Sequence, residues 1–429
     1  MIQRVFEDGY LSGAELAAFV HDAMQREPLD GKRVLFIIPD ATRSMPMPTM
    51  FRALYDAVHA RAAKMDYLIA LGTHPPMPDD AINKMLGITA EERAGIYHGI
   101  GIFNHDWKDP AMLARIGELT EDQLDTISGG RLRKRVPVTI NKRVLDYDLV
   151  CIVGPVFPHE VVGFSGGNKY FFPGVAGEEL LNMFHWLGAL ITNPIINGAK
   201  YTPVRAVVDA AAAMVAVEKR CFCLNVMGKD CKGIFYGAPE EAWSAAADLS
   251  AKTHIVYKDK PFKSVLAMAP EMYDEIWVAG KCMYKLEPVV ADGGELIIYG
   301  PHIREISVTH GELIKRIGYH TRDYFLAQMD NFADIPGGIL AHSTHVRGIG
   351  AYENGVEKCR IQVTLATAIP EPECRAINLG YRDWRTIDPE HWRNREHEGY
   401  LLVERAGEVL YELSLPDHGP HKALKGASK

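Results

Sequence analysis

The chain has 429 residues, of which 47% are hydrophobic and 24% charged, and its formal net charge at pH 7 is -8. This composition is typical of a globular protein, and no apolar run approaches the ~20 residues that a membrane-spanning helix needs. The net negative charge is spread without blocks and leaves no basic surface of the kind that nucleic-acid binding requires. We therefore expect neither a membrane nor a nucleic acid as a partner, and the length predicts two domains.

The amino-terminal segment and the cysteines indicate the cellular compartment. Residues 1–9 lack the apolar core of a secretory signal. The seven cysteines have no metal-type spacing, and Cys221 and Cys223 stand in an apolar run typical of a buried strand. These features predict a cytoplasmic protein with reduced thiols.

Three short apolar runs in the first part of the chain predict buried strands, each followed by polar residues. The runs are residues 33–39, 65–71 and 149–154. Helical stretches at residues 49–61 and 79–86 lie between them, so this part alternates strand and helix and predicts a mainly parallel sheet. Ligands of such sheets gather at the carboxyl ends of the strands. The polar residues that follow the strands are therefore candidate site residues.

A second α/β unit begins near residue 260. Residues 264–269, 275–280 and 294–299 are predicted strands, and the alanine-rich segment 239–257 is a predicted helical bridge. The expected organisation is an α/β protein with an amino-terminal catalytic and cofactor-binding domain (1–260), a carboxyl-terminal α/β domain (261–415) and a polar tail (416–429). We expect the active site in the cleft between the two domains.

The most informative segment is a glycine-rich stretch from Gly154 to His185. It places His159, Lys169 and His185 in the spacing His-x9-Lys-x15-His around Gly-Phe-Ser-Gly-Gly-Asn-Lys. Glycines let the backbone approach a ligand closely, and a lysine can act as a nucleophile or bind an anion. The segment matches neither the dinucleotide-binding glycine pattern nor the phosphate-binding loop of nucleotide hydrolases. A less common ligand is expected.

The motifs occur in a recognisable order. Asp40-x-Thr42-Arg43 is followed by Gly72-Thr73-His74, by Asn104-His105, and then by the central histidine–lysine–histidine segment. Over about the first 260 residues this ordered set resembles the nickel-dependent lactate racemase family. The carboxyl-terminal third resembles that family only in outline.

The resemblance implies a nickel-pincer nucleotide, a pyridinium-3-thioamide-5-thiocarboxylate mononucleotide that carries nickel. By this resemblance, Lys169 is the covalent attachment point through a thioamide and His185 is the nickel ligand. Such nitrogen and sulfur ligation suits nickel. His105 and His159 match the two general bases, and a neutral imidazole near pH 7 can take a hydroxyl proton and return it.

The other motif residues are assigned to the cofactor and the substrate. Arg43 can hold a substrate carboxylate bidentately, and either Lys281 or Lys285 replaces a substrate-binding lysine of the family. A proline, Pro75, stands where the family usually has an arginine. Residues expected to contact the cofactor are Asp40, Thr42, Gly72, Thr73, His74, Gly166 and Gly167.

The resemblance implies a racemase or 2-epimerase of 2-hydroxy acids. The C2 hydrogen of such an acid is too weakly acidic for removal by an imidazole, so the reaction needs a hydride acceptor. Polar clusters that include His302, Arg304, His342, His345 and Arg347 favour a substrate with more oxygen atoms than lactate. Expected partners are that small molecule and the proteins that synthesise the cofactor, and a homo-oligomer stays open.

Two alternatives remain. In the first, His74, His105 and His159 bind zinc in a hydrolase or hydro-lyase. In the second, the protein carries the nickel cofactor through Lys169 and His185 without turnover.

Overall fold

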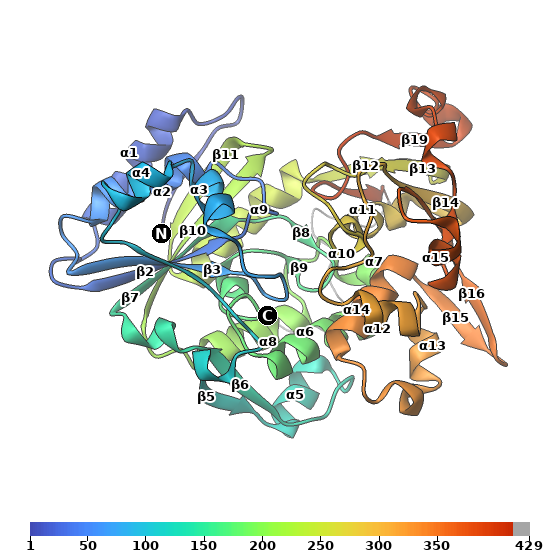
Figure 1. Cartoon of the computed structure of the whole chain (residues 1–429), viewed down its shortest axis with the longest axis horizontal. Helices are drawn as coiled ribbons and strands as arrows, with labels where there is room; N and C mark the ends of the chain where they lie inside the picture. The colour runs from blue at the N-terminus through green and yellow to red at the C-terminus, as the bar shows by residue number, and fades with distance from the viewer. Residues whose placement is uncertain (415–429) are drawn as a thin grey trace.

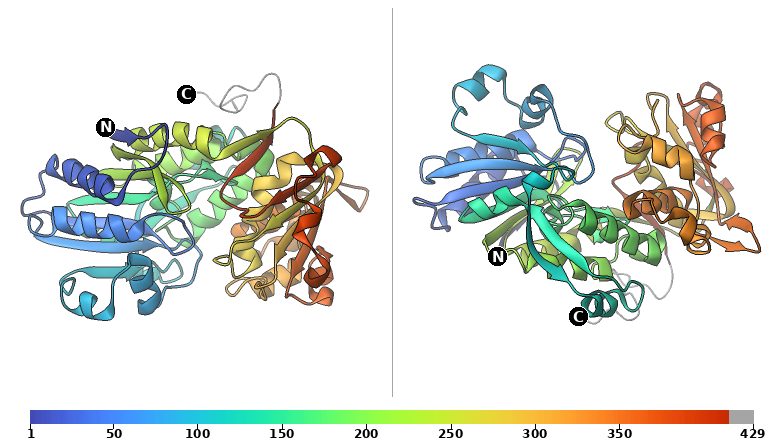
Figure 2. Two further views of the ribbon diagram at one scale, coloured as in Figure 1. Left: turned by 90° about the horizontal axis from the view of Figure 1, so that it is seen from above. Right: turned by 60° about the horizontal axis from the view of Figure 1, so that its bottom comes forward.

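The computed structural model describes residues 1–414. The predicted polar tail, 416–429, lies outside the described residues. The chain is a mixed α/β protein whose two main sheets lie in two halves of the molecule (Figure 1, Figure 2). One sheet is formed by residues 2–237 and the other by residues 262–403. Within residues 1–414, no helix is long and apolar enough to cross a membrane.

The first sheet has seven strands in the order β1-β11-β10-β7-β2-β3-β4. The five strands from β10 to β4 pair in parallel, and β11 and β1 add an antiparallel edge. This confirms the mainly parallel sheet that the alternating strands and helices predict. The strands are β1 (Ile2–Val5), β2 (Arg33–Pro39), β3 (Lys64–Ala70), β4 (Gly101–Asn104), β7 (Leu149–Pro155), β10 (Glu218–Met227) and β11 (Asp230–Gly237).

Both faces of this sheet are covered, which explains why its central strands are continuously apolar. Along β2, Leu35 and Ile37 belong to one buried cluster, while Val34, Phe36 and Ile38 belong to another. The first cluster is completed by α6 (Glu178–Ile191), α8 (Pro203–Ala212) and α9 (Pro239–Thr253), and the second by α1 (Gly13–Gln25), α2 (Met47–Val58) and α3 (Asp79–Leu86).

Smaller elements complete this part of the chain. They are the antiparallel pairs β5 (Leu113–Leu119) with β6 (Val136–Asn141) and β8 (Pro158–His159) with β9 (Gly163–Phe164), and the helices α4 (Ala90–Ala94), α5 (Glu121–Ser128) and α7 (Asn193–Ile196).

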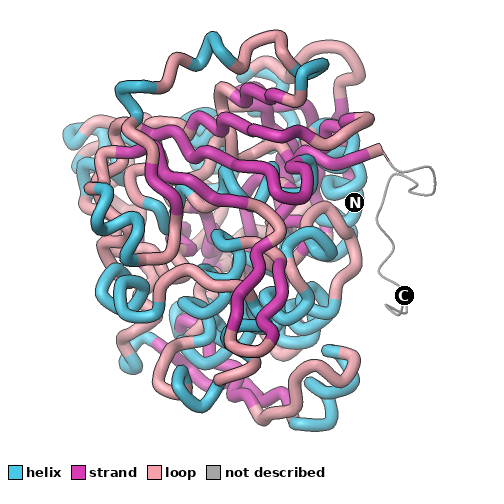
Figure 3. Tube along the Cα trace, turned by 90° about the vertical axis from the view of Figure 1, so that its right-hand side faces the viewer, coloured by secondary structure: helices cyan, strands magenta, loops and turns pink. Residues whose placement is uncertain are grey.

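The second sheet has five strands, all parallel, in the order β18-β17-β14-β13-β19, and Figure 3 turns this half toward the viewer. The strands are β13 (Phe262–Met268), β14 (Val290–Gly300), β17 (Gln362–Thr367), β18 (Gly380–Tyr381) and β19 (Tyr400–Val403). Its helices are α10 (Ile276–Ala279), α11 (Lys281–Leu286), α12 (Gly311–Ile317), α13 (Arg322–Leu326), α14 (Gly337–Arg347) and α15 (Glu371–Ala376), and β15 (Gly350–Glu353) and β16 (Val356–Cys359) form a hairpin.

The last described strand returns toward the first half. β20 (Leu410–Leu413) pairs in parallel with β12 (Ile255–Lys258), which follows α9. Leu410 and Ile255 are both buried in the cluster that covers the first sheet. The boundary near residue 260 stays a prediction, but the chain crosses between the two halves twice.

One predicted strand is wrong. Residues 275–280 contain the helix α10, which runs into α11 after Gly280. A short apolar run such as Ile276–Ala279 fits a buried strand and a buried helical turn equally well. In the folded chain the Ile276 and Val278 side chains are buried in the core of the second half.

Gly163, the first residue of β9, lies where the backbone of the central segment is tightly packed. Its φ is +88°, and a Cβ there would lie 1.8 Å from the carbonyl oxygen of Ala199. We expect Gly163→Ala to lower the free energy of unfolding by about 3 kcal/mol or more, because left-handed strain and overpacking add. Gly355→Ala is the control, since Gly355 has a φ of +80° but open space around it. Guanidinium unfolding measures both, and equal losses would contradict the packing argument.

Candidate active site

The glycine-rich segment folds as a loop on a rigid base. β8 and β9 form a short hairpin, and residues 167–170 form a 3-10 turn that ends beside Lys169. Gly166 has a φ of +83°, and a Cβ there would lie 2.6 Å from the Cγ2 atom of Val156. The loop therefore needs glycine at this position to pass close to its neighbours.

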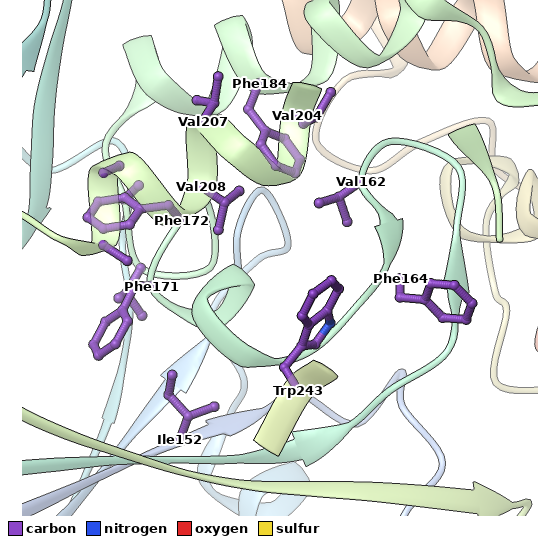
Figure 4. Close-up of a cluster of buried hydrophobic side chains, with 14 of the residues drawn as sticks. Ile152, Val162, Phe164, Phe171, Phe172, Phe184, Val204, Val207, Val208 and Trp243 are labelled. Atoms are coloured by element: carbon purple, nitrogen blue, oxygen red, sulfur yellow. The ribbon is translucent and has the colours of Figure 1, made fainter. Parts of the chain in front are cut away.

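A buried arginine, Arg205, fixes the backbone of this loop. The Arg205 guanidinium donates to the carbonyl oxygen of Phe164 at 2.5 Å and to that of Gly166 at 3.4 Å. It also lies 4.0 Å above the ring of Trp243, whose Nε1 donates to the carbonyl oxygen of Ser165 at 2.9 Å. Phe164 and Trp243 belong to the core cluster drawn in Figure 4. The course of the backbone before Lys169 is thereby fixed.

Most of the predicted site residues line one cavity between the two halves of the chain. Side chains of the first half face a wall contributed by α10, α11 and α14. The predicted residues that line it are Asp40, Arg43, Gly72, Thr73, His74, His159, Gly166, Lys169, His185 and Lys281. Thr42, His105, Gly167 and Lys285 do not line this cavity.

Asp40 and His74 form a carboxylate–imidazole pair at the ends of β2 and β3. The Asp40 Oδ2 atom accepts a hydrogen bond from the His74 Nδ1 atom, and Oδ1 accepts from the hydroxyl of Thr42 at 2.6 Å. Burial alone would raise the pKa of Asp40, but His74, Arg43 and Thr42 hold it well below its usual range. The carboxylate stays ionised, and its hydrogen bond fixes a hydrogen on the Nδ1 atom of His74. The Nε2 atom of His74 is then the ring nitrogen left for another partner.

His159 has a different environment. Its Nδ1 atom accepts a hydrogen bond from the backbone N–H of Val161 at 3.1 Å and lies 3.5 Å from the Oε2 atom of Glu160. Burial, and then the positive charges of Lys169 and Lys285, lower the pKa of His159 well below its usual value. The ring is therefore neutral at physiological pH.

Lys169 and His185 have the properties that covalent attachment and metal ligation need. Burial, with the nearby charge of Arg43, lowers the pKa of Lys169 to about 7, so a large share of its amine is an uncharged nucleophile at neutral pH. The Nδ1 atom of His185 donates to the carbonyl oxygen of Leu181 at 2.7 Å. This fixes the proton on Nδ1 and leaves Nε2 free for a metal, the usual arrangement of a metal-binding histidine.

His105 lies outside the cavity and has no free ring nitrogen. Its Nε2 atom donates to the carbonyl oxygen of Ala176 at 2.9 Å, and its Nδ1 atom accepts from the side-chain amide of Asn141 at 3.1 Å. The side chain is 1% exposed. In this structure His105 connects the end of β4 to the end of β6 and to the loop before α6.

The wall from the second half offers two unpaired polar groups. The amine of Lys281 and the Nε2 atom of His345 are buried without a hydrogen-bond partner. His342 is held by the hydroxyls of Tyr284, at 2.9 Å from Nδ1, and Tyr319, at 3.2 Å from Nε2. Burial lowers the pKa of Lys281 well below its usual value. A ligand that donates and accepts hydrogen bonds would satisfy both free groups.

Lys285, one turn beyond Lys281 on α11, does not line this cavity but lines an adjoining pocket together with His159 and Lys281. Its amine donates to the carbonyl oxygen of Pro158, next to His159. Burial lowers the pKa of Lys285 to about 8, and the charge of Glu160 opposes part of that effect. The sequence left Lys281 and Lys285 as alternatives. The structure places Lys281 at the cavity and Lys285 against the backbone beside His159.

Other expected contacts are used within the protein. The backbone N–H of Gly72 donates to the carbonyl oxygen of Gly174, and that of His74 to Leu71. Gly167 faces Trp243, and the Nε2 atom of His302 donates to the carbonyl oxygen of Tyr273 at 3.1 Å. The backbone N–H groups of Gly72 and His74 are therefore not available to a phosphate.

Sequence reasoning missed Glu160 and Trp277, which both line the cavity. Glu160 follows His159 directly, so its position beside a candidate base was a usable signal. Trp277 was missed because residues 275–280 were predicted to form a strand.

Comparisons with known proteins identify the family. The family model described as "Lactate racemase N-terminal domain" matches residues 19–195. The lactate racemase of Thermoanaerobacterium thermosaccharolyticum is 28% identical over 192 residues, which are 41% of this chain and 39% of that protein. The chain belongs to the lactate racemase family. The lactate racemase of Lactiplantibacillus plantarum is 27% identical over 222 residues, 50% of this chain and 47% of that protein.

Each of these matches thus spans less than half the length of the lactate racemase concerned. Two solved structures extend the similarity to nearly the whole chain. A protein from Thermotoga maritima has a TM-score of 0.87 and 31% identity, covering 95% of this chain and 100% of its own. The lactate racemase apoprotein from T. thermosaccharolyticum has a TM-score of 0.69 and 18% identity, covering 94% of both chains, and shows the shared fold.

The low pKa of Lys169 predicts an unusually reactive amine. In protein without cofactor, modification by acetic anhydride should rise through a midpoint near pH 7, because the amine loses its proton there. Exposed Lys315 is the reference site for ordinary lysine reactivity in the same samples. Peptide mass spectrometry after short pulses measures both sites. Modification of Lys169 only above about pH 9 would contradict the environment described here.

Proposed function

We propose that the protein is a racemase or 2-epimerase of 2-hydroxy acids. The observation that carries the proposal is the shared cavity of His74, His159, Lys169 and His185, in a chain of the lactate racemase family. A nucleophilic amine, an imidazole suited to bind a metal and two further imidazoles in one buried cavity are typical of a catalytic site rather than a structural one.

The residues fit the nickel-pincer nucleotide that the family implies. Lys169 offers a neutral amine for the covalent link, and His185 presents Nε2 for nickel. Gly166, where the loop has no room for a side chain, lines the same cavity. When bound, this cofactor would supply a reversible acceptor for the hydride from C2.

The protein's own groups would bind the substrate and move its hydroxyl proton. Arg43 and Lys281 would hold the carboxylate, since both line the cavity and the Lys281 amine has no protein partner. His74 would accept the hydroxyl proton on Nε2 while Asp40 stabilises the resulting imidazolium. His159 would serve the second enantiomer.

His74 thus takes the base role that the sequence assigned to His105. The two nitrogens of His105 are engaged by Ala176 and Asn141, whereas His74 has a free Nε2 atom and a carboxylate partner. We propose that His105 supports the site by holding β4 against the loops.

The substrate we propose is larger and richer in oxygen than lactate. His342 and His345 line the cavity, and the Nε2 atom of His345 has no partner. A sugar acid or a dicarboxylate would bring oxygen atoms to this wall. His302 and Arg347 do not line the cavity, and we assign them no substrate contact.

The alternatives have less support. Within residues 1–414 no group of three or more histidine, cysteine or acidic side chains is arranged to hold a metal, and His105 does not line the cavity that His74 and His159 share. A protein-only zinc site of these three histidines is therefore disfavoured. A non-catalytic carrier would not need the Asp40–His74 pair. Cytoplasmic location, cofactor-synthesis partners and a homo-oligomer remain expectations from the sequence.

Activity of the loaded enzyme tests the proposal. His74→Asn and His159→Asn should each lower kcat by at least about 100-fold, the range of general acid–base catalysis, with bound nickel unchanged. Surface His391→Asn is the control. Chiral chromatography of 2-hydroxy acids measures inversion, and deuterium at C2 should remain in the product. No mass increment on Lys169 and no inversion of any acid would refute the proposal.

Lys281 tests substrate binding separately. Lys281→Met should raise KM for the acid about tenfold or more with a smaller effect on kcat, because a charged hydrogen bond contributes about 1.5–3 kcal/mol. Lys315→Met on the surface is the matched control. A change in kcat alone would argue against carboxylate binding by Lys281.

A comparison of acids tests the proposed larger substrate. Faster turnover of lactate than of gluconate or malate would contradict it.

A further inference from the structure

The Nδ1 atom of His159 lies near two groups that require opposite protonation of that atom, a backbone N–H that is hydrogen-bonded to it and a carboxylate. The backbone N–H of Val161 donates to Nδ1 at 3.1 Å, which needs a lone pair there. The Oε2 atom of Glu160 lies 3.5 Å from the same Nδ1 and can only accept a hydrogen from it. A neutral ring can satisfy one partner at a time.

The two arrangements give His159 different chemistry toward the cavity. With Val161 as partner, the proton is on Nε2, and the ring donates to an oxygen of the ligand. With Glu160 as partner, the proton is on Nδ1, and Nε2 is free to accept the hydroxyl proton. Only the second arrangement is a general base.

We propose that Glu160 is a positioning residue that holds His159 in its base tautomer, in the way that Asp40 holds His74. The inference rests on the proposed function, because it gives the second base the same carboxylate support as the first. No covalent step is involved, and the proton moves only between the nitrogens of one ring through exchange with solvent or ligand.

The surroundings of Glu160 keep its carboxylate charged. Burial alone would raise the pKa of Glu160, but Lys285, His345 and Lys169 lower it below its ordinary value. Lys285 also bonds the carbonyl oxygen of Pro158. One lysine from the second half of the chain therefore stabilises the carboxylate and fixes the backbone before the imidazole.

Several basic groups around His159 oppose protonation of its ring. Lys169, Lys285, Arg43 and the ring of His185 all disfavour an imidazolium at this position. Glu160 is the acidic side chain in contact with the ring. Accepting a proton on Nε2 would place a cation among these groups, and the neighbouring carboxylate would offset that charge.

The tautomer can be observed without cofactor or turnover. In protein carrying 15N-labelled histidine, the protonated and unprotonated ring nitrogens have distinct shifts, and His159→Gln assigns the signals. We expect the wild type to show a population with hydrogen on Nδ1, and Glu160→Met to lose it. Glu160→Gln keeps an acceptor oxygen without charge and should be intermediate. Identical spectra in all three proteins would overturn the inference.

Glu398→Met is the matched control, because Glu398 also follows a histidine and lies 3.6 Å from its ring, but on the exposed surface. It should leave the His159 signals and the activity unchanged. Thermal unfolding of each variant confirms that it is folded.

Kinetics of the loaded enzyme give the second readout. Glu160→Met should lower kcat at least about tenfold with KM within about twofold, and Glu160→Gln should restore part of the loss. A rise in KM at constant kcat would mean that Glu160 binds substrate and would overturn the positioning role. Absence of any racemisation would refute the proposed function instead, and the 15N spectra would still decide the tautomer.

Discussion

The site depends on one buried charge, the guanidinium of Arg205. Among residues 1–414 no carboxylate is hydrogen-bonded to this group, and its partners are the carbonyl oxygens of Phe164 and Gly166. A charge removed from water is stable only when such partners are fixed in place. The carbonyls must therefore point inward, which turns the rest of the loop, including Lys169, toward the cavity. The position of Lys169 therefore depends on the hydrogen bonds that Arg205 makes to the backbone of the same loop.

Burial has a second consequence, since it favours the neutral forms of the basic groups in the cavity. Lys169, His159 and His185 all have lowered pKa values because desolvation disfavours their charged forms. Asp40 and Glu160 remain ionised because cations and hydrogen-bond donors surround them. The cavity thus combines neutral nitrogen bases with anionic partners. Such a set can move protons without a large change of net charge.

Some of this could be predicted from the sequence, and the reasons are local. Strands β2, β3 and β7 were evident because they are continuous apolar runs, and their carboxyl ends brought Asp40, His74 and the central loop together. The helix at Ile276–Ala279 was not evident, because four apolar residues carry no periodicity. The choice between His74 and His105 also depended on tertiary contacts. Both histidines follow strands, and only the folded chain shows that Asn141 and Ala176 occupy the nitrogens of His105.

The pairing of β12 with β20 bears on how the halves can move. Two chain crossings, at residues 255–258 and 410–413, lie side by side and are hydrogen-bonded to each other. A single tether would allow one half to swivel freely, whereas a double-stranded joint bends about one axis and resists torsion. Any opening of the cavity would therefore move α11 away from the hairpin of Pro158 along one path, and closure would return Lys281 and Lys285 to the same positions.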